Sequence, residues 1–158
     1  MNNVQTILCT VLGKPDSHKA VNKAIDLALV HDAKLIFATV LNADFMGKAT
    51  PIMASLRVVL DQLHELGSFT LSLLCDQARS RGVKEVESII REGRIIPQLR
   101  KLIVEIHPEI LVLGRPVARG KPVFSVSPNQ IDDFLSEIRT LEKVAVEVID
   151  MNNNKNED

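Results

Sequence analysis

Apolar residues recur along the chain in two alternating patterns. Short runs rich in β-branched residues predict buried strands, and longer segments with apolar residues every three or four positions predict amphipathic helices. The predicted strands span residues 4–12, 33–41, 83–90, 109–114 and 143–150. The predicted helices span residues 17–30, 52–80, 95–107 and 128–141. The order of elements along the chain is therefore βαβαβαβαβ.

Strands that alternate with helices in this way form a parallel sheet with right-handed crossovers. We therefore expect the α/β class, as a single doubly wound five-stranded parallel sheet with helices on both faces. The ligand crevice of such a domain lies at the carboxyl ends of the strands, where the strand order reverses. If the first strand is central, the loops after Leu12 and after Gly114 face each other. We expect one domain over residues 1–150, followed by a disordered polar tail at 151–158.

The longest predicted helix, at residues 52–80, carries an apolar stripe that we expect to face the core. Its members are Leu56, Val59, Leu60, Leu63, Leu66, Leu74 and Ala78. Gly67 interrupts this helix at a cost of about 1 kcal/mol relative to Ala. Gly82, just past the basic end of the helix, is a typical stop signal. The charged residues of the following strand predict an exposed edge.

Composition and charge narrow the function classes. Aromatic residues make up 3% of the chain, with no Trp and no Tyr, which argues against a base-stacking surface for single-stranded nucleic acid. The net charge of −1 provides no field that would draw the protein to DNA or to a membrane. No apolar run is long enough to span a bilayer, and the amino terminus lacks the pattern of a signal peptide. We expect a cytoplasmic protein that binds neither nucleic acid nor membrane.

The residues that usually carry metal or nucleophilic chemistry are scattered. Cys9 lies inside an apolar run and is expected to be a small core residue. His31, His64 and His107 are far apart and fit no metal-ligand spacing, so we expect no metal site and read them as surface or cap residues. No Ser lies in a nucleophile elbow. The sequence therefore predicts no catalytic residue.

Two short motifs lie where the crevice is expected. Gly13-Lys14 resembles part of a phosphate-binding P-loop, but Leu8 and Pro15 occupy positions that such a loop needs as Gly and Ser or Thr. We therefore read "GKPDS" as a strand-to-helix turn. "SPNQ", which begins at Ser127, is a capping box that starts the fourth predicted helix, and a helix start of this kind is compatible with a bound anion.

Two segments, "ILCTVLGKPDSHKAVNKAIDLA" and "EGRIIPQLRKLIVEIHPEILVLG", together with the long loop before the last helix, resemble a universal stress protein domain. The resemblance covers roughly residues 4–150. It implies a Rossmann-like sheet of the adenine nucleotide alpha hydrolase-like type, with strand order 3-2-1-4-5. It also implies a homodimer, commonly formed through the last strand, and a role in stress physiology with no defined reaction.

Nucleotide-binding members of that family carry an Asp at the end of the first strand and a glycine pattern after the fourth. The pattern is Gly, two residues, Gly, nine residues, then Gly followed by Ser or Thr. Here the spacing fits from Gly114, but Val117, Ser127 and Pro128 fill the other three positions, and Leu12 replaces the Asp. The side chain of Val117 hinders the approach of phosphate to the backbone, and Pro128 has no N–H to donate. Each lost polar contact lowers the binding free energy by about 1 kcal/mol. We expect ATP binding in the usual family mode to be weak or absent.

Positive charges gather in the two loops that are expected to face each other: Lys14 in the first, and Arg115, Arg119 and Lys121 in the second. They form either a solvated basic rim or a site for a phosphate- or carboxylate-bearing ligand held by Arg side chains. Between Gly114 and Asp132 the chain contains no acidic residue. The candidate binding residues are those near the carboxyl ends of the predicted strands and in these loops: Val11, Leu12, Gly13, Lys14, Val40, Gly114, Arg115, Val117, Arg119, Gly120, Lys121 and Ser127.

The last predicted strand, "KVAVEVID", has an apolar face of Val144, Val146 and Val148. An unprotected apolar edge strand usually finds a partner, and antiparallel pairing with the same strand of a second copy would be symmetric and closed. We therefore predict a homodimer through this strand. The alternative is an ordinary edge covered by the tail.

Two functions are compatible with these features. The first is a non-enzymatic, homodimeric regulatory or binding module that acts through protein partners or an anionic ligand. The second is an ATP- or AMP-binding protein with weak or no hydrolysis, in which Arg115, Arg119 and Lys121 replace the loop glycines. The lost Asp and glycines favour the first. A doubly wound enzyme such as a flavoprotein shares the topology, but the chain carries no fingerprint for one.

Overall fold

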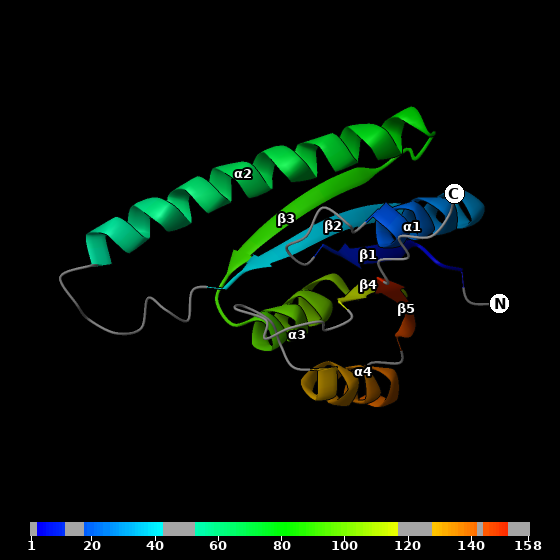
Figure 1. Cartoon of the computed structure of the whole chain (residues 1–158). Coiled ribbons are helices and arrows are strands. Elements are labelled where there is room, and N and C mark those ends of the chain that lie inside the picture. The colour runs from blue at the N-terminus through cyan, green and yellow to red at the C-terminus, as the bar shows by residue number, and fades with distance from the viewer. Residues whose placement is uncertain (1–2, 12–17, 43–52, 117–127, 142–143, 152–158) are drawn as a thin grey trace, which may run out of the picture.

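The computed structural model describes residues 3–11, 18–42, 53–116, 128–141 and 144–151 (Figure 1). The strands are β1 (Thr6–Thr10), β2 (Lys34–Leu41), β3 (Val86–Glu92), β4 (Ile110–Pro116) and β5 (Ala145–Met151). The helices are α1 (His18–His31), α2 (Met53–Ser80), α3 (Ile95–Ile106) and α4 (Pro128–Leu141). The alternation of strands and helices is the predicted one.

The strands form one parallel sheet of order β3-β2-β1-β4-β5, which confirms the α/β doubly wound fold. The first strand is central, and its residues Ile7, Leu8 and Cys9 have no solvent exposure. A strand covered on both faces must be apolar on both sides, which explains its unbroken apolar run. The third strand lies at the opposite edge of the sheet from β5, as its charges predict.

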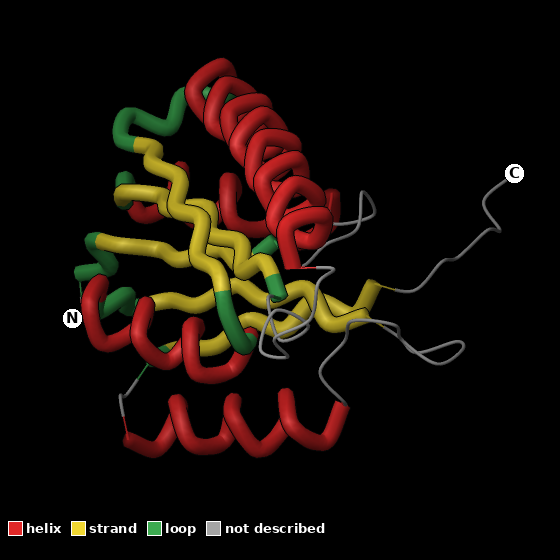
Figure 2. The backbone as a smooth tube through the Cα atoms, turned by 90° about the vertical axis from the view of Figure 1, so that its left-hand side faces the viewer, coloured by secondary structure: helices red, strands yellow, loops and turns green. Residues whose placement is uncertain are grey.

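Helices cover both faces of the sheet, as Figure 2 shows from the side. On one face α1 and α2 pack on the odd-numbered residues of β1, with Ala24 and Leu71 buried against Cys9 in one apolar cluster. On the other face α3 and α4 pack through Leu99 and Phe134. Because side chains alternate along a strand, each face of the sheet has its own core.

Several strand boundaries differ from the prediction by two or three residues. The third strand begins at Val86 instead of residue 83, because residues 81–83 complete the end of α2. Gly82 has φ +108° and the Val83 N–H donates to the Ala78 carbonyl at 3.1 Å. The fourth strand continues to Pro116 and the fifth to Met151, so Met151 belongs to the sheet and not to the predicted tail. Residues 152–158 lie outside the described residues.

The predicted core stripe of α2 is wrong for three of its residues. Val59, Leu63 and Leu66 are 46%, 43% and 62% exposed. Leu60 and Ala78 of the predicted stripe are buried and Leu74 is half-buried, and Leu71 and Cys75 complete the buried side of the helix. The helix has apolar residues on two nearly opposite sides, and the sheet covers only one of them. The side chain of Leu56 lies outside the described residues.

The third helix ends one residue earlier than predicted. His107 adopts a left-handed conformation (φ 50°, ψ 54°), and its N–H donates to the Ile103 carbonyl at 2.9 Å. This backbone capping terminates the helix before Pro108. His31, His64 and His107 are all exposed, in agreement with the expectation of surface or cap residues.

Candidate functional site

The predicted crevice is built on the carboxyl ends of β1 and β4, which are neighbours in the sheet. Thr10 of β1 is in register with Leu113 of β4. The chain leaves β1 for β2 on one side, while β4 lies on the other, so the strand order reverses at this point. The structure therefore places the switch point of the fold where the sequence predicted it.

The end of β1 is held firmly by its neighbours. The Val11 N–H donates to the Ala38 carbonyl at 2.8 Å, and the Thr39 hydroxyl donates to the Val11 carbonyl at 2.7 Å. The buried Thr10 hydroxyl is 3.4 Å from the Val112 carbonyl. Both backbone groups of Val11 are thus engaged within the protein. Val11 can offer a ligand only its apolar side chain.

Two predicted site residues, Val11 and Val40, lie on different faces of the sheet. Val11 belongs to the core under α1 and α2, and Val40 to the core under α3 and α4. Both are nearly buried, at 9% and 7% exposure. The structure therefore does not bring these two side chains together on one wall of a crevice. Each packs into the core on its own face of the sheet.

Gly114 and Arg115 lie within β4 and not in the loop that follows it. The strand continues because β5 runs alongside, with Gly114 in register with Ile149 and Arg115 with Asp150. Sequence reasoning missed this acidic neighbour, because Asp150 is distant in the chain and becomes adjacent only through strand pairing. The expectation that Arg115 projects from a loop is wrong for its backbone.

The other predicted binding residues lie outside the described residues: Leu12, Gly13, Lys14, Val117, Arg119, Gly120, Lys121 and Ser127. Their flanking helices are described. The first helix begins at the exposed His18, and the fourth begins at Pro128, as the capping box predicts. These helices cover opposite faces, and each follows a strand that ends at the same edge of the sheet. Two helix amino termini, which carry partial positive charge, are thus directed toward this edge.

The described residues provide no reactive thiol. Burial raises the pKa of the Cys9 thiol to about 12. Burial also raises the pKa of the Cys75 thiol, while Arg79 and a hydrogen bond with Ser88 act in the opposite direction. Because the thiolate is the nucleophile and the metal ligand, both cysteines are inert core residues. Among the described residues, no three His, Cys, Asp or Glu side chains gather into a metal-ligand set.

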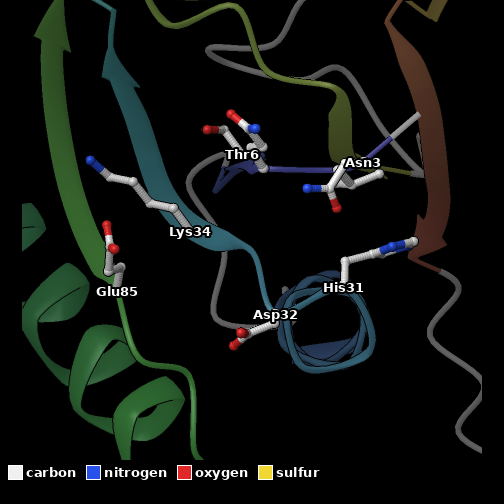
Figure 3. Close-up of a pocket in the computed structure, with 8 residues that line it drawn as sticks. Asn3, Thr6, His31, Asp32, Lys34 and Glu85 are labelled. Carbon is white, nitrogen blue, oxygen red and sulfur yellow. The ribbon is translucent and has the colours of Figure 1, made fainter. Parts of the chain in front are cut away.

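An open pocket of about 490 Å³ lies at the opposite, amino-terminal edge of the sheet (Figure 3). It is lined by residues that include Thr6, His31, Asp32, Lys34 and Glu85. Lys34, which lines the pocket, already has a partner, because its ammonium pairs with the Glu87 carboxylate at 2.6 Å. This pocket is separate from the predicted crevice.

Comparison with known proteins places the chain in a family. The sequence profile of the universal stress protein family matches residues 3–122. The chain belongs to the universal stress protein family. No curated protein sequence gave a match. The resemblance stated from the sequence is thereby confirmed.

Solved structures of universal stress proteins share the fold at low sequence identity. UspA from Lactobacillus plantarum is 17% identical with a TM-score of 0.75, over 94% of this chain and 99% of its own. A universal stress protein in complex with cAMP is 19% identical with a TM-score of 0.59, over 96% and 100%. A family member from Arabidopsis thaliana with AMP bound is 16% identical with a TM-score of 0.57, over 96% and 94%. At these identities the likeness concerns the fold.

No helix in the part of the chain that the structure describes is both long enough and apolar enough to cross a membrane. The longest, α2, carries Arg57, Asp61, Glu65 and Asp76 along its length.

Proposed function

We propose that this universal stress protein is a non-enzymatic, homodimeric binding module. Its carboxyl-edge crevice binds ATP weakly or not at all in the usual family mode, and it holds another anion. Lys14, Arg115, Arg119 and Lys121 are the side chains that would bind the anion. The observation that carries the proposal is the combination of a retained switch point between β1 and β4 with the loss of the residues that hold ATP there. For example, the branched Val117 stands where nucleotide-binding family members have a loop glycine.

The described residues around the switch point support a ligand held from the loops. No buried side-chain nitrogen or oxygen in the described part of the chain lacks a hydrogen-bond partner. The backbone groups of Val11 are also engaged. Polar recognition would therefore come from Arg115 near the end of β4 and from residues 12–17 and 117–127, which hold the other basic side chains of the proposal. Arginine suits this role because its planar guanidinium binds phosphate or carboxylate through two hydrogen bonds.

The second candidate is an AMP- or ATP-binding protein in which Arg115, Arg119 and Lys121 replace the glycine backbone. The observation that favours it is the existence of relatives of the same fold in complex with cAMP and with AMP. It requires adenine to lie beside the carboxyl ends of β1 and β2 without the Asp that Leu12 replaces. Each missing polar contact weakens that binding by about 1 kcal/mol, so we rank this candidate second.

Thermal unfolding with and without Mg-ATP, AMP and inorganic phosphate tests the proposal. A ligand at 100 times its Kd adds about 2.7 kcal/mol to the free energy of unfolding. We expect stabilisation by phosphate, little further gain from adenine nucleotides, and loss of the effect in Arg115→Ala with Arg119→Ala. The control is Arg139→Ala, which removes an exposed cation from the last turn of α4. Stabilisation by AMP that phosphate alone does not reproduce would favour the second candidate, and no stabilisation by any anion would contradict both.

The proposed homodimer forms through β5, which is the edge strand beside β4. Val144 is buried in the core, and Val146 and Val148 are half-buried against it. The Ala145 N–H donates to the Glu109 carbonyl of the neighbouring strand segment. Because backbone groups alternate in direction along a strand, the N–H and C=O groups of Val146 and Val148 point to the free edge. Antiparallel pairing with a second copy would use these groups.

The variant Val146→Pro tests this edge with little disturbance inside one subunit. It removes an N–H that the internal sheet does not use, whereas Glu147→Pro removes one that it does. We expect light scattering to show that Val146→Pro halves the mass of the assembly while circular dichroism stays unchanged. We expect Glu147→Pro to lower the unfolding temperature as well. An unchanged mass in a folded Val146→Pro variant would rule out the β5 interface.

A further inference from the structure

The outer face of α2 is apolar and exposed, and the proposed function does not use it. The exposed residues Val58, Val59, Leu63, Leu66, Phe69 and Leu73 follow one another at helical spacing on the side of α2 away from the sheet. In Figures 1 and 2, α2 is the outermost element on its side of the molecule, and no other described element covers this side. Single exposed apolar residues are ordinary, but a continuous stripe marks an interaction surface.

The size of this stripe is sufficient for a specific contact. From Val58 to Leu73 it runs about 22 Å along the helix. Its six side chains expose on the order of 600 Å², at the upper end of apolar patches on monomeric proteins. Two such stripes in contact would bury about 1,200 Å², which is the lower limit for specific protein interfaces.

Apart from Val58, the residues of the stripe are symmetrically spaced. Val59, Leu63, Leu66, Phe69 and Leu73 are separated by four, three, three and four positions. Read in either direction from Leu66, the spacing is the same. Two antiparallel copies related by a two-fold axis at Leu66 would therefore place Leu66 against Leu66, Leu63 against Phe69, and Val59 against Leu73. A surface that fits its own copy in this way forms a closed, symmetric pair.

The charges around the stripe disfavour a lipid surface as the occupant. Helices that lie on membranes carry Lys and Arg on their polar flanks. By helical spacing, the charged residues that border this stripe are Glu65 and Asp76, and α2 contains no Lys. An acidic border would be repelled by anionic lipids. A second copy of the chain requires no such attraction.

We infer that the outer face of α2 binds the same face of a second copy in an antiparallel, two-fold arrangement centred on Leu66. This contact is distinct from the β5 edge and does not depend on the anion site. A chain with both contacts assembles into four or more copies. A chain with one of them forms dimers, and the two contacts can be removed separately.

Disulfide capture tests the register of the α2 contact. Under mild oxidation, Leu66→Cys should give a cross-linked dimer in most molecules, since the two copies of residue 66 meet at the axis. Ser72→Cys is the matched control, because it is exposed on the same helix but its two copies would lie about 18 Å apart. Val59→Cys and Leu73→Cys should cross-link with each other when mixed and not with themselves. Native Cys9 and Cys75 are buried and contribute little background.

Sedimentation velocity and light scattering test the same contact without oxidation. Leu66→Glu should reduce the assembly to the dimer formed through β5, and Leu66→Glu with Val146→Pro should be monomeric. The matched control is Val104→Glu, which charges an apolar residue of similar exposure on α3, on the other face of the sheet, and should leave the mass unchanged.

Three results would overturn the inference. The first is no cross-linking of Leu66→Cys above the Ser72→Cys control, and the second is an unchanged mass for Leu66→Glu. The third is loss of binding to phosphatidylcholine–phosphatidylserine vesicles in Leu66→Glu without a change in mass, which would assign the face to a lipid surface. A mass that falls in Val146→Pro and stays unchanged in Leu66→Glu would support the β5 dimer and contradict the α2 contact. The anion titration is unaffected by any of these outcomes.

Discussion

The two sides of α2 have similar apolar content but opposite environments. On the inner side Leu60, Leu71, Cys75 and Ala78 are at most 4% exposed, because β2, β3 and the neighbouring core cover them. On the outer side Leu66 and Phe69 are 62% and 63% exposed. The pattern of apolar residues alone cannot distinguish these sides. Only the position of the sheet decides which stripe is core and which is free to bind a partner.

The largest expected effect is on the inner side. Leu71→Ala removes a buried side chain next to the core of β1 and should lower the free energy of unfolding by about 2–5 kcal/mol. Leu66→Ala on the outer side should change it by no more than about 0.5 kcal/mol. Urea denaturation at protein concentrations where subunits are dissociated measures both values. Equal losses in the two variants would contradict the assignment of the two sides.

A smaller effect should come from Cys9, which lies in the core beneath α1 and α2. Its pKa is raised from an ordinary value of 9.0 to about 12, so above pH 9 the unfolded chain loses this proton while the folded chain keeps it. Stability should therefore fall as pH rises from 9 toward 12, by about 1 kcal/mol at pH 10. Wild type and Cys9→Ala are compared by urea denaturation at pH 8 and pH 10. A Cys9→Ala variant that loses as much stability as the wild type over this interval would show that the thiol is not desolvated.

The smallest effect should come from Gly67, which faces the sheet at the middle of α2. A Cβ atom there would lie 3.5 Å from Ile90 Cδ1, an ordinary contact, so Gly67→Ala should stabilise the helix by about 0.5–1 kcal/mol. Gly82→Ala is the opposite control, because its φ of +108° is strained for any other residue and the variant should be less stable. Thermal unfolding measures both. A destabilised Gly67→Ala variant would mean that α2 lies closer to the sheet than described.

The fold could be predicted from the sequence because its strands and helices have unambiguous periods. A run such as "TILCT" has apolar residues on both sides, Ile7 and Cys9 on one and Leu8 on the other, and it became the central strand. The lengths of the segments and the alternation of strands with helices are then compatible with only a few chain topologies. Boundaries were harder, since β4 and β5 lengthen each other by pairing, which no local pattern at Pro116 or Met151 reveals.

The position of the switch point could be predicted, and the arrangement of the described residues around it only in part. The switch point beside Thr10 and Leu113 follows from topology. The separation of Val11 and Val40 onto different faces follows from strand alternation once the sheet is known. Asp150 beside Arg115 did not follow from the sequence, because it depends on the register of two strands. The charges counted along one segment do not include charged residues of another strand that the sheet places next to it.

The central claim is that this crevice has lost the family's ATP contacts and has kept an anion site. Isothermal titration with Mg-ATP and with inorganic phosphate tests it on the wild type and on a chain with the family pattern restored by Leu12→Asp, Val117→Gly, Ser127→Gly and Pro128→Ser. We predict that the wild type binds phosphate and binds ATP no more tightly, and that the restored chain gains ATP affinity by tenfold or more, on the order of 1.4 kcal/mol. ATP binding by the wild type as tight as that of the restored chain would contradict the account.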